Sequence, residues 1–389
     1  MVLRSSLKYT RPSVASNRPD TEPSPSEGLL AGTTVADLEA VRLLLRGGSV
    51  VDWHRLAMRD LVDVDRFLRV NEFDPSIEHD LHRMDYLRSQ AVEYLRRNFG
   101  FRIPDDIAED VPIRDLFLLA SKKNRRQQYA CIVLKVMHII HHLAGRELLF
   151  RSPISDGEVF HLVERKVVRL VEEIRAAGHP IVEFEWSRKP RDSLITKLLA
   201  KRSTLAANVY DKLRFRLVVK NATDILPLLI ELTHRLIPFN YVVPGESVND
   251  ILLLRRAASE SPTLASLAEK LQGDIELEEK EEQAKDRGNE FSGPGYRIIN
   301  FVADLPVKLD DFLCRVGDPT AQDFGSIVFV LTEFQIVDAR TSRDNEAGEN
   351  SHDKYKDRQL SRVKMRLLRG MPADDKLVPE SGDRGSDEG

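Results

Sequence analysis

The hydrophobic pattern of this 389-residue chain changes near Gly178, and that change limits the folds it can adopt. Between about residues 35 and 150, apolar residues recur about every three to four positions, which is typical of amphipathic helices. After Gly178, short runs of alternating and β-branched residues are typical of strands, with helical segments between them. These patterns predict an α+β protein in which a mixed β-sheet is flanked by helices and follows an N-terminal all-helical domain.

The second half of the chain supplies the predicted strands and the helices between them. Strands are expected over residues 181–186, 213–219, 297–302, 327–331 and 333–337, and helices over about 192–207 and 223–236. A further helix is predicted to begin at Ser155, whose hydroxyl can cap it while Glu158 reaches back, and to end at Gly178.

Composition divides the chain into four parts. Residues 1–34 are rich in Ser, Pro, Thr and Arg and predict a disordered leader, while residues 371–389 predict a disordered acidic tail. A helical domain is expected over 35–150. The strand-containing domain is expected over 151–370, with a charged insertion at about 251–292 that suits an exposed helix or a mobile segment.

Charge and cysteine usage restrict the possible partners and the compartment. The net charge is −4, so no global positive field favours nucleic acid, which we do not expect as a partner. Cys131 and Cys314 are too few for a disulfide framework, which fits a reducing cytoplasm. No signal peptide and no run of about 18 apolar residues is visible, so we expect no membrane contact. The oligomeric state is left open.

A polar string in the C-terminal third combines strand and loop residues. Because strand side chains alternate, Glu333 and Gln335 fall on one face, and Phe334 and Ile336 fall on the other. The string continues through Glu346, Gly348, His352, Tyr355 and Lys356.

Two more patches combine charged residues at regular spacing. Lys189, Ser193 and Lys197 recur every fourth residue, so near a helix start they would point together toward a polyphosphate. The alternative is a helix with ordinary exposed lysines. Asp211 and Arg216 stand five residues apart where a predicted strand begins.

Read in order, these patches and Gly295-Tyr296-Arg297 resemble the catalytic half of RelA/SpoT-type alarmone synthetases, which have a nucleotidyltransferase-like fold. The resemblance covers about residues 155–370, and Asn240-Tyr-Val-Val-Pro adds a weaker match. The matching site positions are Lys189, Ser193, Lys197, Asp211, Arg216, Tyr296, Glu333, Gln335 and His352.

The resemblance implies a pyrophosphokinase of guanosine tetraphosphate (ppGpp) metabolism and the stringent response. It would transfer pyrophosphate from ATP to the 3′-hydroxyl of GDP, GTP or another nucleotide and release AMP. Asp211 and Glu333 would be catalytic and hold Mg²⁺, with Glu333 also helping to deprotonate the acceptor hydroxyl. The implied ATP and phosphate ligands are Lys189, Ser193, Lys197 and Arg216. The implied acceptor ligands are Tyr296, stacked on guanine, with Gln335 and His352.

Several positions differ from the family pattern. Ser187, beside Arg188, replaces an Arg of the adenine clasp, Asn300 replaces a His, and Val337-Asp338 replaces an Arg-Thr pair. Two alternatives therefore stay open. The same fold could bind nucleotide without turnover, as a sensor or partner protein, or it could modify RNA 3′ ends.

Histidines in the helical part suggest weaker hypotheses. His79-Asp80 spells the pair used by metal-dependent phosphohydrolases, but that chemistry needs further His and Asp ligands in one pocket, so hydrolysis is not favoured. On the apolar helix, His138, His141 and His142 are predicted to be packed or surface residues rather than metal ligands.

Overall fold

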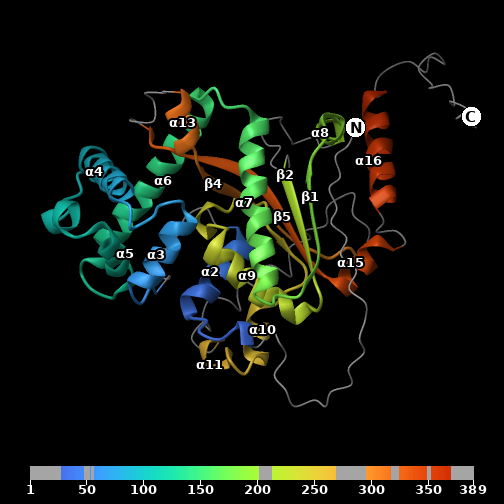
Figure 1. Cartoon of the computed structure of the whole chain (residues 1–389), viewed down its shortest axis with the longest axis horizontal. Helices are drawn as coiled ribbons and strands as arrows, with labels where there is room; N and C mark the ends of the chain where they lie inside the picture. The colour runs from blue at the N-terminus through green and yellow to red at the C-terminus, as the bar shows by residue number, and fades with distance from the viewer. Residues whose placement is uncertain are drawn as a thin grey trace, which may run out of the picture.

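The computed structural model describes residues 28–47, 53, 57–200, 213–268, 295–316, 324–347 and 352–368. Within them, five strands form one mixed sheet in the order β1-β2-β5-β4-β3, with helices packed around it (Figure 1). This confirms the predicted α+β arrangement. The acidic tail, residues 1–27 of the leader and most of the insertion lie outside the described residues.

The elements follow one another as the change in hydrophobic pattern predicts. The helices before the sheet are α2 (Val35–Arg46), α3 (Leu61–Val70), α4 (Glu78–Phe99), a π-helical turn (Asp106–Asp110), α5 (Ile113–Ser121), α6 (Gln127–Arg151) and α7 (Asp156–Ala176). The strands are β1 (Ile181–Arg188), β2 (Leu213–Val219), β3 (Val248–Asn249), β4 (Ile299–Lys308) and β5 (Ile327–Asp338). The helices after β1 are α8 (Arg191–Ala200), α9 (Ile225–Arg235), α10 (Leu254–Glu260), α11 (Ala265–Ala268), α13 (Asp310–Val316), α15 (Ala339–Glu346) and α16 (His352–Leu367). No helix of the described ranges is both long enough and apolar enough to cross a bilayer.

Local chemistry explains where the predicted boundaries were right and wrong. The capping box at Ser155 is present, because Glu158 N–H donates to the Ser155 hydroxyl and the Ser155 N–H donates to the Glu158 carboxylate. The prediction of separate strands over 327–331 and 333–337 was wrong. Thr332 lies inside the continuous β5, where it is fully buried and its hydroxyl donates to the Val330 carbonyl (3.0 Å).

One face of the sheet is covered by α2, α7 and α9 and carries a ladder of stacked rings. Phe184, Phe215, Phe334 and Phe301 come from β1, β2, β5 and β4, with ring centroids 6.2, 5.6 and 5.5 Å apart along the series. Phe215, Phe334 and Phe301 are fully buried. Stacked aromatic pairs contribute beyond the area that they bury, so this ladder joins four strands laterally.

Helices α3 to α6 form a second core against one end of the opposite face. Ile327 and Phe329 at the start of β5 belong to this core. At Gly145 of α6, an added Cβ would lie 2.5 Å from the Phe329 ring, so helix and strand touch without an intervening side chain. Next to this contact, His142 Nε2 of α6 lies 2.7 Å from Asp304 Oδ2 of the neighbouring strand β4. The predicted domain boundary at residue 150 falls in the last turn of α6.

The His79-Asp80 pair has a structural explanation. Asp80 is buried and accepts hydrogen bonds from Lys308 Nζ (2.7 and 2.8 Å) and from the Asp74 N–H (2.7 Å), while His79 is exposed. Asp80 thus joins α4 to β4. The hydrolase hypothesis gains no support from these contacts.

The three histidines of α6 pack as predicted. His138 stacks on Tyr241 with ring centroids 4.5 Å apart, and His141 is buried between Phe73 and Phe329. Burial lowers the pKa of His138 to about 4 and that of His141 to about 3.

Replacing Phe334 by Ala should lower the free energy of unfolding by about 3 to 5 kcal/mol, because a fully buried ring would leave a cavity in the ladder. Phe150→Ala is the matched control, since Phe150 is 91% exposed and should change stability little. Urea unfolding followed by circular dichroism measures both. Equal losses in the two variants would contradict this account of the core.

Stability should fall as the pH is lowered from about 6.5 toward 4. The unfolded chain takes up protons on His138 and His141 near their ordinary pKa of 6.5, while the folded chain does not until its lower pKa values are reached. Each histidine should cost about 2 kcal/mol between pH 6.5 and 5. Urea unfolding at pH 7 and pH 5 measures this loss. His141→Phe should show a smaller loss, and an unchanged loss would contradict the assignment.

Candidate functional site

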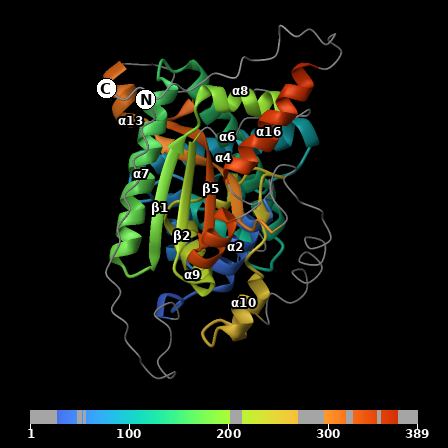
Figure 2. The same cartoon turned by 90° about the vertical axis from the view of Figure 1, so that its right-hand side faces the viewer.

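Polar side chains from four strands form two rows on the face opposite the phenylalanine ladder. The strand registers place the first row as Ser187, Arg214, Glu333 and Val302, and the second as Glu185, Arg216, Gln335 and Asn300. Because side chains alternate along a strand, all of these lie on one side of the sheet. Figure 2 shows β1, β2 and β5 toward the viewer, with α8 and α16 across one end of the strands.

Glu333 lies at the centre of the first row and is held by two neighbours. The Arg214 Nε donates to Glu333 Oε2 at 2.7 Å, and the Gln335 amide donates to Oε1 at 3.2 Å. Glu333 is only 7% exposed, so the carboxylate depends on these partners. Arg214 was not among the predicted site residues. The alternation of polar residues in β2 would have indicated it, since it shares its face with Arg216.

Arg216 connects the second row to α15. Its guanidinium donates to the Ser342 hydroxyl at 2.9 Å and lies 3.4 Å from Glu346 Oε1. Asp338 caps the start of α15 by accepting from the N–H groups of Arg340 and Thr341. Burial raises the pKa of Asp338, but these hydrogen bonds outweigh burial and lower it below its usual value. The cap therefore fixes the helix that holds Arg216.

Tyr296 lies at the far end of the same face. It is half-buried and packs on a small cluster formed by Val218, Ile298 and Val337. The segment is held by Asn345, which accepts from the Arg297 N–H at 3.0 Å and donates to the Arg297 carbonyl at 2.7 Å. The structure thus brings Tyr296, Arg216, Glu333 and Gln335 to one face, and it confirms that Glu333 and Gln335 lie on the same side of their strand. Asn345 gave no recognisable sequence signal.

The lysine patch lies where β1 leads into α8. The helix begins at Arg191, so Ser193 and Lys197 are one turn apart on it, while Lys189 precedes it. All three side chains are half-buried. Arg188, which precedes the patch, pairs with Glu164 of α7 at 2.7 Å.

Two predicted residues cannot be placed. Asp211 lies outside the described residues. His352 is the first residue of α16, but its side chain does not belong to the described part of the structure. Helix α16 packs on α8 through Val363 and Ala200, so the two helices that carry the outer predicted residues are neighbours.

A second buried carboxylate lies on this face, beside the first row. Asp304 lies on β4, two residues after Val302, and pairs with Leu331 of β5, two residues before Glu333. It is 3% exposed. His142 Nε2 lies 2.7 Å and Arg146 Nη1 lies 3.4 Å from its Oδ2. Helix α6 therefore forms a wall of the site. Burial, together with the charge of Asp304, raises the pKa of Tyr241 well above its ordinary value.

Of the two predicted magnesium ligands, Glu333 is in contact with other side chains, and Asp211 lies outside the described residues. The described residues contain no group of three or more His, Cys, Asp and Glu side chains that could hold a metal ion. Both oxygens of Glu333 are in hydrogen bonds with other side chains. Mg²⁺ takes oxygen ligands in a nearly octahedral arrangement, so the ion would have to displace one of these hydrogen bonds to reach Glu333.

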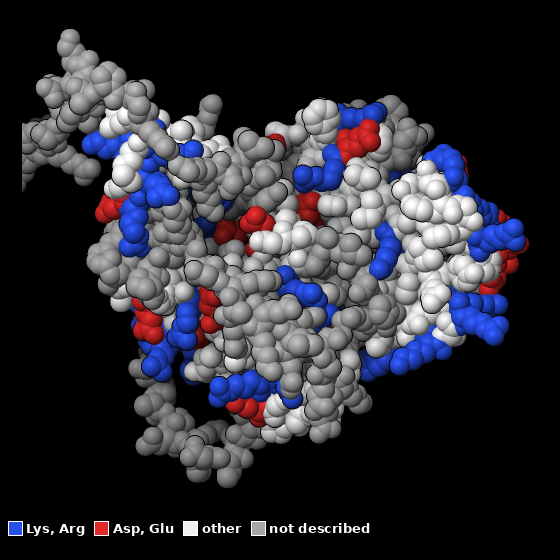
Figure 3. Space-filling model, turned by 180° about the vertical axis from the view of Figure 1, so that it is seen from behind, with Lys and Arg blue, Asp and Glu red and all other residues white. Residues whose placement is uncertain are grey.

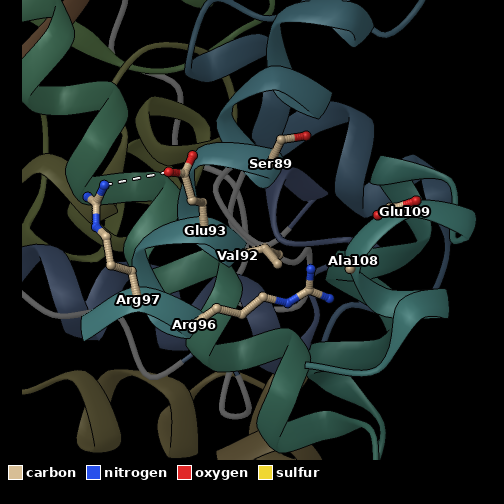
Figure 4. A pocket seen from close by; sticks show the side chains of 7 residues that line it. All are labelled: Ser89, Val92, Glu93, Arg96, Arg97, Ala108 and Glu109. Carbon is tan, nitrogen blue, oxygen red and sulfur yellow. Dashed lines mark ion pairs between the residues drawn. The ribbon is translucent and has the colours of Figure 1, made fainter. Parts of the chain in front are cut away.

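The helical side also carries a surface pocket, but its charges are largely engaged. It has a volume of about 460 Å³ and is lined by Ser89, Val92, Glu93, Arg96, Arg97, Ala108 and Glu109 (Figure 4). Arg97 pairs with Glu93 and Arg96 with Asp105, each at 3.5 Å. None of the predicted site residues lines it. Figure 3 shows charges of both signs distributed over the described surface seen from behind.

Comparisons with solved structures find similarity to alarmone synthetases. Small alarmone synthetase 2 from Bacillus subtilis is 13% identical, with 54% of this chain and 91% of that chain covered at a TM-score of 0.29. Small alarmone synthetase 1 from the same organism, bound to its product pppGpp, is 14% identical, with 59% and 90% covered at a TM-score of 0.26. A GTP pyrophosphokinase family protein from Streptococcus pneumoniae is 15% identical, with 54% and 84% covered at a TM-score of 0.25. With TM-scores this low, the function of these proteins cannot be assigned to this chain from the similarity. No protein-family model and no curated protein sequence matches the chain.

Replacing Asn345 by Ala should release the segment that carries Tyr296. The Arg297 N–H loses its acceptor, so its amide hydrogen exchange should accelerate by at least about tenfold. Hydrogen exchange measured by NMR or mass spectrometry tests this. Ser342→Ala is the control in the same helix, and it should leave the exchange of Arg297 unchanged. Equal exchange in Asn345→Ala and the unaltered protein would contradict the proposed contact.

Proposed function

We propose that this chain binds nucleoside polyphosphates on the polar face of its sheet, in a site of the RelA/SpoT-like pyrophosphokinase type. The observation that carries the proposal is the register of β2 with β5, which places Arg214 and Arg216 beside Glu333 and Gln335 on one face. Two guanidinium groups on a rigid strand suit phosphate oxygens, to which arginine can donate paired hydrogen bonds.

The reaction proposed for this site is pyrophosphate transfer from ATP to the 3′-hydroxyl of a guanosine nucleotide. The hydroxyl oxygen attacks the β-phosphorus of ATP, and the bond from that phosphorus to the α-phosphate oxygen breaks. AMP leaves, and the proton of the hydroxyl passes to the Glu333 carboxylate or to water. Lys189, Ser193 and Lys197 support the donor end, since they lie where β1 leads into α8. Tyr296 supports the acceptor end, because it places an aromatic ring on this face and aromatic rings can stack on bases. We place this activity in the cytoplasm, with Cys131 and Cys314 as free thiols.

A second candidate function is nucleotide binding without transfer. The contact that favours it is the ion pair between Arg214 and Glu333, because a carboxylate held at 2.7 Å by a guanidinium is a poor base and a poor metal ligand. In this form the protein would sense a nucleotide and report it to a partner.

Labelled ATP separates these candidates. Purified protein is incubated with ATP and Mg²⁺, together with GDP, GTP, ADP or tRNA as acceptor. AMP release with GDP or GTP supports the transferase, and release only with tRNA supports modification of RNA ends. Nucleotide binding in equilibrium dialysis without AMP release supports the second candidate. Absence of both binding and AMP release would refute the proposal as a whole.

Tyr296→Ala should weaken guanosine nucleotide binding by roughly five- to a hundredfold, because stacking of a base on an aromatic ring contributes about 1 to 3 kcal/mol. Equilibrium dialysis with GDP measures the loss. Tyr86→Ala is the matched control, since Tyr86 is an exposed ring on α4, away from the polar face. Equal affinities for the Tyr296→Ala and Tyr86→Ala proteins would exclude Tyr296 from the site.

A further inference from the structure

Arg214 occupies the side of Glu333 that a metal ion would need. The two residues are lateral neighbours in the parallel pair of β2 and β5, and Arg214 Nε lies 2.7 Å from Glu333 Oε2. The opposite oxygen accepts from Gln335. A Mg²⁺ ligand oxygen must lie about 2.0 to 2.1 Å from the ion, so a second, doubly charged cation would meet the guanidinium at close range.

The pair is specific to these two residues. Arg216 stands two positions further along the same strand face, yet its guanidinium contacts Ser342 and Glu346 of α15 instead. Arg214 has 34% of its side chain exposed and Glu333 has 9%, so the contact is screened less than a surface ion pair. Strand backbone fixes both Cα positions, so the Arg214 side chain stays within reach of the carboxylate.

The second buried acid on this face is neutralised in the same way. Asp304 has His142 and Arg146 of α6 as its partners. Glu333 and Asp304, the two buried carboxylates of this face, thus each contact a cationic or imidazole side chain of the protein. Such a face neutralises its two buried acids and still presents arginines to phosphate.

We infer that Arg214 takes the place of a divalent cation at Glu333, so that the site binds nucleotide phosphates without a metal at this carboxylate. The inference rests on the proposed function in one respect, because it concerns the same face of the sheet. Its chemical consequence is that nucleotide affinity depends on arginine charge rather than on Mg²⁺.

Mn²⁺ is the probe for the test, because free Mn²⁺ gives an electron paramagnetic resonance signal that is lost on binding. Without nucleotide, the unaltered full chain and the Glu333→Gln variant should leave the same Mn²⁺ signal at millimolar Mn²⁺. Arg214→Gln should gain a site with affinity about tenfold or more above the unaltered protein, and adding Glu333→Gln should remove it. Arg214→Met replaces Arg214→Gln if the latter does not fold, as judged by circular dichroism.

Two matched variants separate charge position from charge number. Arg214→Lys keeps a cation beside Glu333 and should gain no Mn²⁺ site. Arg216→Gln removes one positive charge from the same strand face and should gain none either. Mn²⁺ binding by the unaltered protein that disappears in Glu333→Gln would overturn the inference, and so would the absence of a gain in both Arg214→Gln and Arg214→Met.

Nucleotide binding distinguishes failure of this inference from failure of the proposed function. The unaltered protein should bind GDP or ATP equally well in EDTA and in Mg²⁺. Loss of binding in EDTA alone overturns the inference and leaves the proposed function intact. Absence of binding under both conditions refutes the proposed function, while the Mn²⁺ measurement on the nucleotide-free protein still decides the inference.

Discussion

The parallel pairing of β2 with β5 is the constraint on which both the core and the site depend. It aligns Arg214 with Glu333 and Arg216 with Gln335 on one face, and Phe215 with Phe334 on the other. A slip of one residue would reverse the faces of one strand and place charges among the phenylalanine rings. Burying an unpaired charge costs far more than any single contact here gains, so the ladder fixes the register that the polar face requires.

The polar face is bounded by elements distant in sequence, each fixed by a few contacts. Helix α6 lies beside Asp304, α15 holds Arg216 through Ser342, and the same helix holds the backbone of Arg297 through Asn345. Helix α8 lies at the opposite end of the strands and packs on α16. The walls of the site therefore come from both halves of the chain, although the floor comes from the sheet alone.

Sequence periodicity predicted the floor of the site better than its walls. Alternation correctly assigned Glu333, Gln335 and Arg216 to strand positions, and the capping box fixed the start of α7. It could not show which side chain would face Glu333, because lateral pairing between strands far apart in sequence has no local signal. Alternation could have placed Arg214 on the same face as Arg216, but its pairing with Glu333 was missed for that reason, and so was the contact of Asp304 with α6. Asn345 lies on α15, where no sequence signal marked it. The predicted magnesium site paired Glu333 with Asp211 and did not include the cation that the neighbouring strand places beside Glu333.

The absence of a side chain at Gly145 has a consequence for how this protein could change shape. Helix α6 rests on Phe329, and Glu333 follows four residues later on the same face of β5. Close-packed surfaces transmit displacement because nothing compressible lies between them. Helix α6 and strand β5 must therefore move as one rigid unit. Removing the N-terminal helices would also remove the partners of Asp304. The N-terminal helices are part of the architecture of the polar face, rather than an appendage beside it.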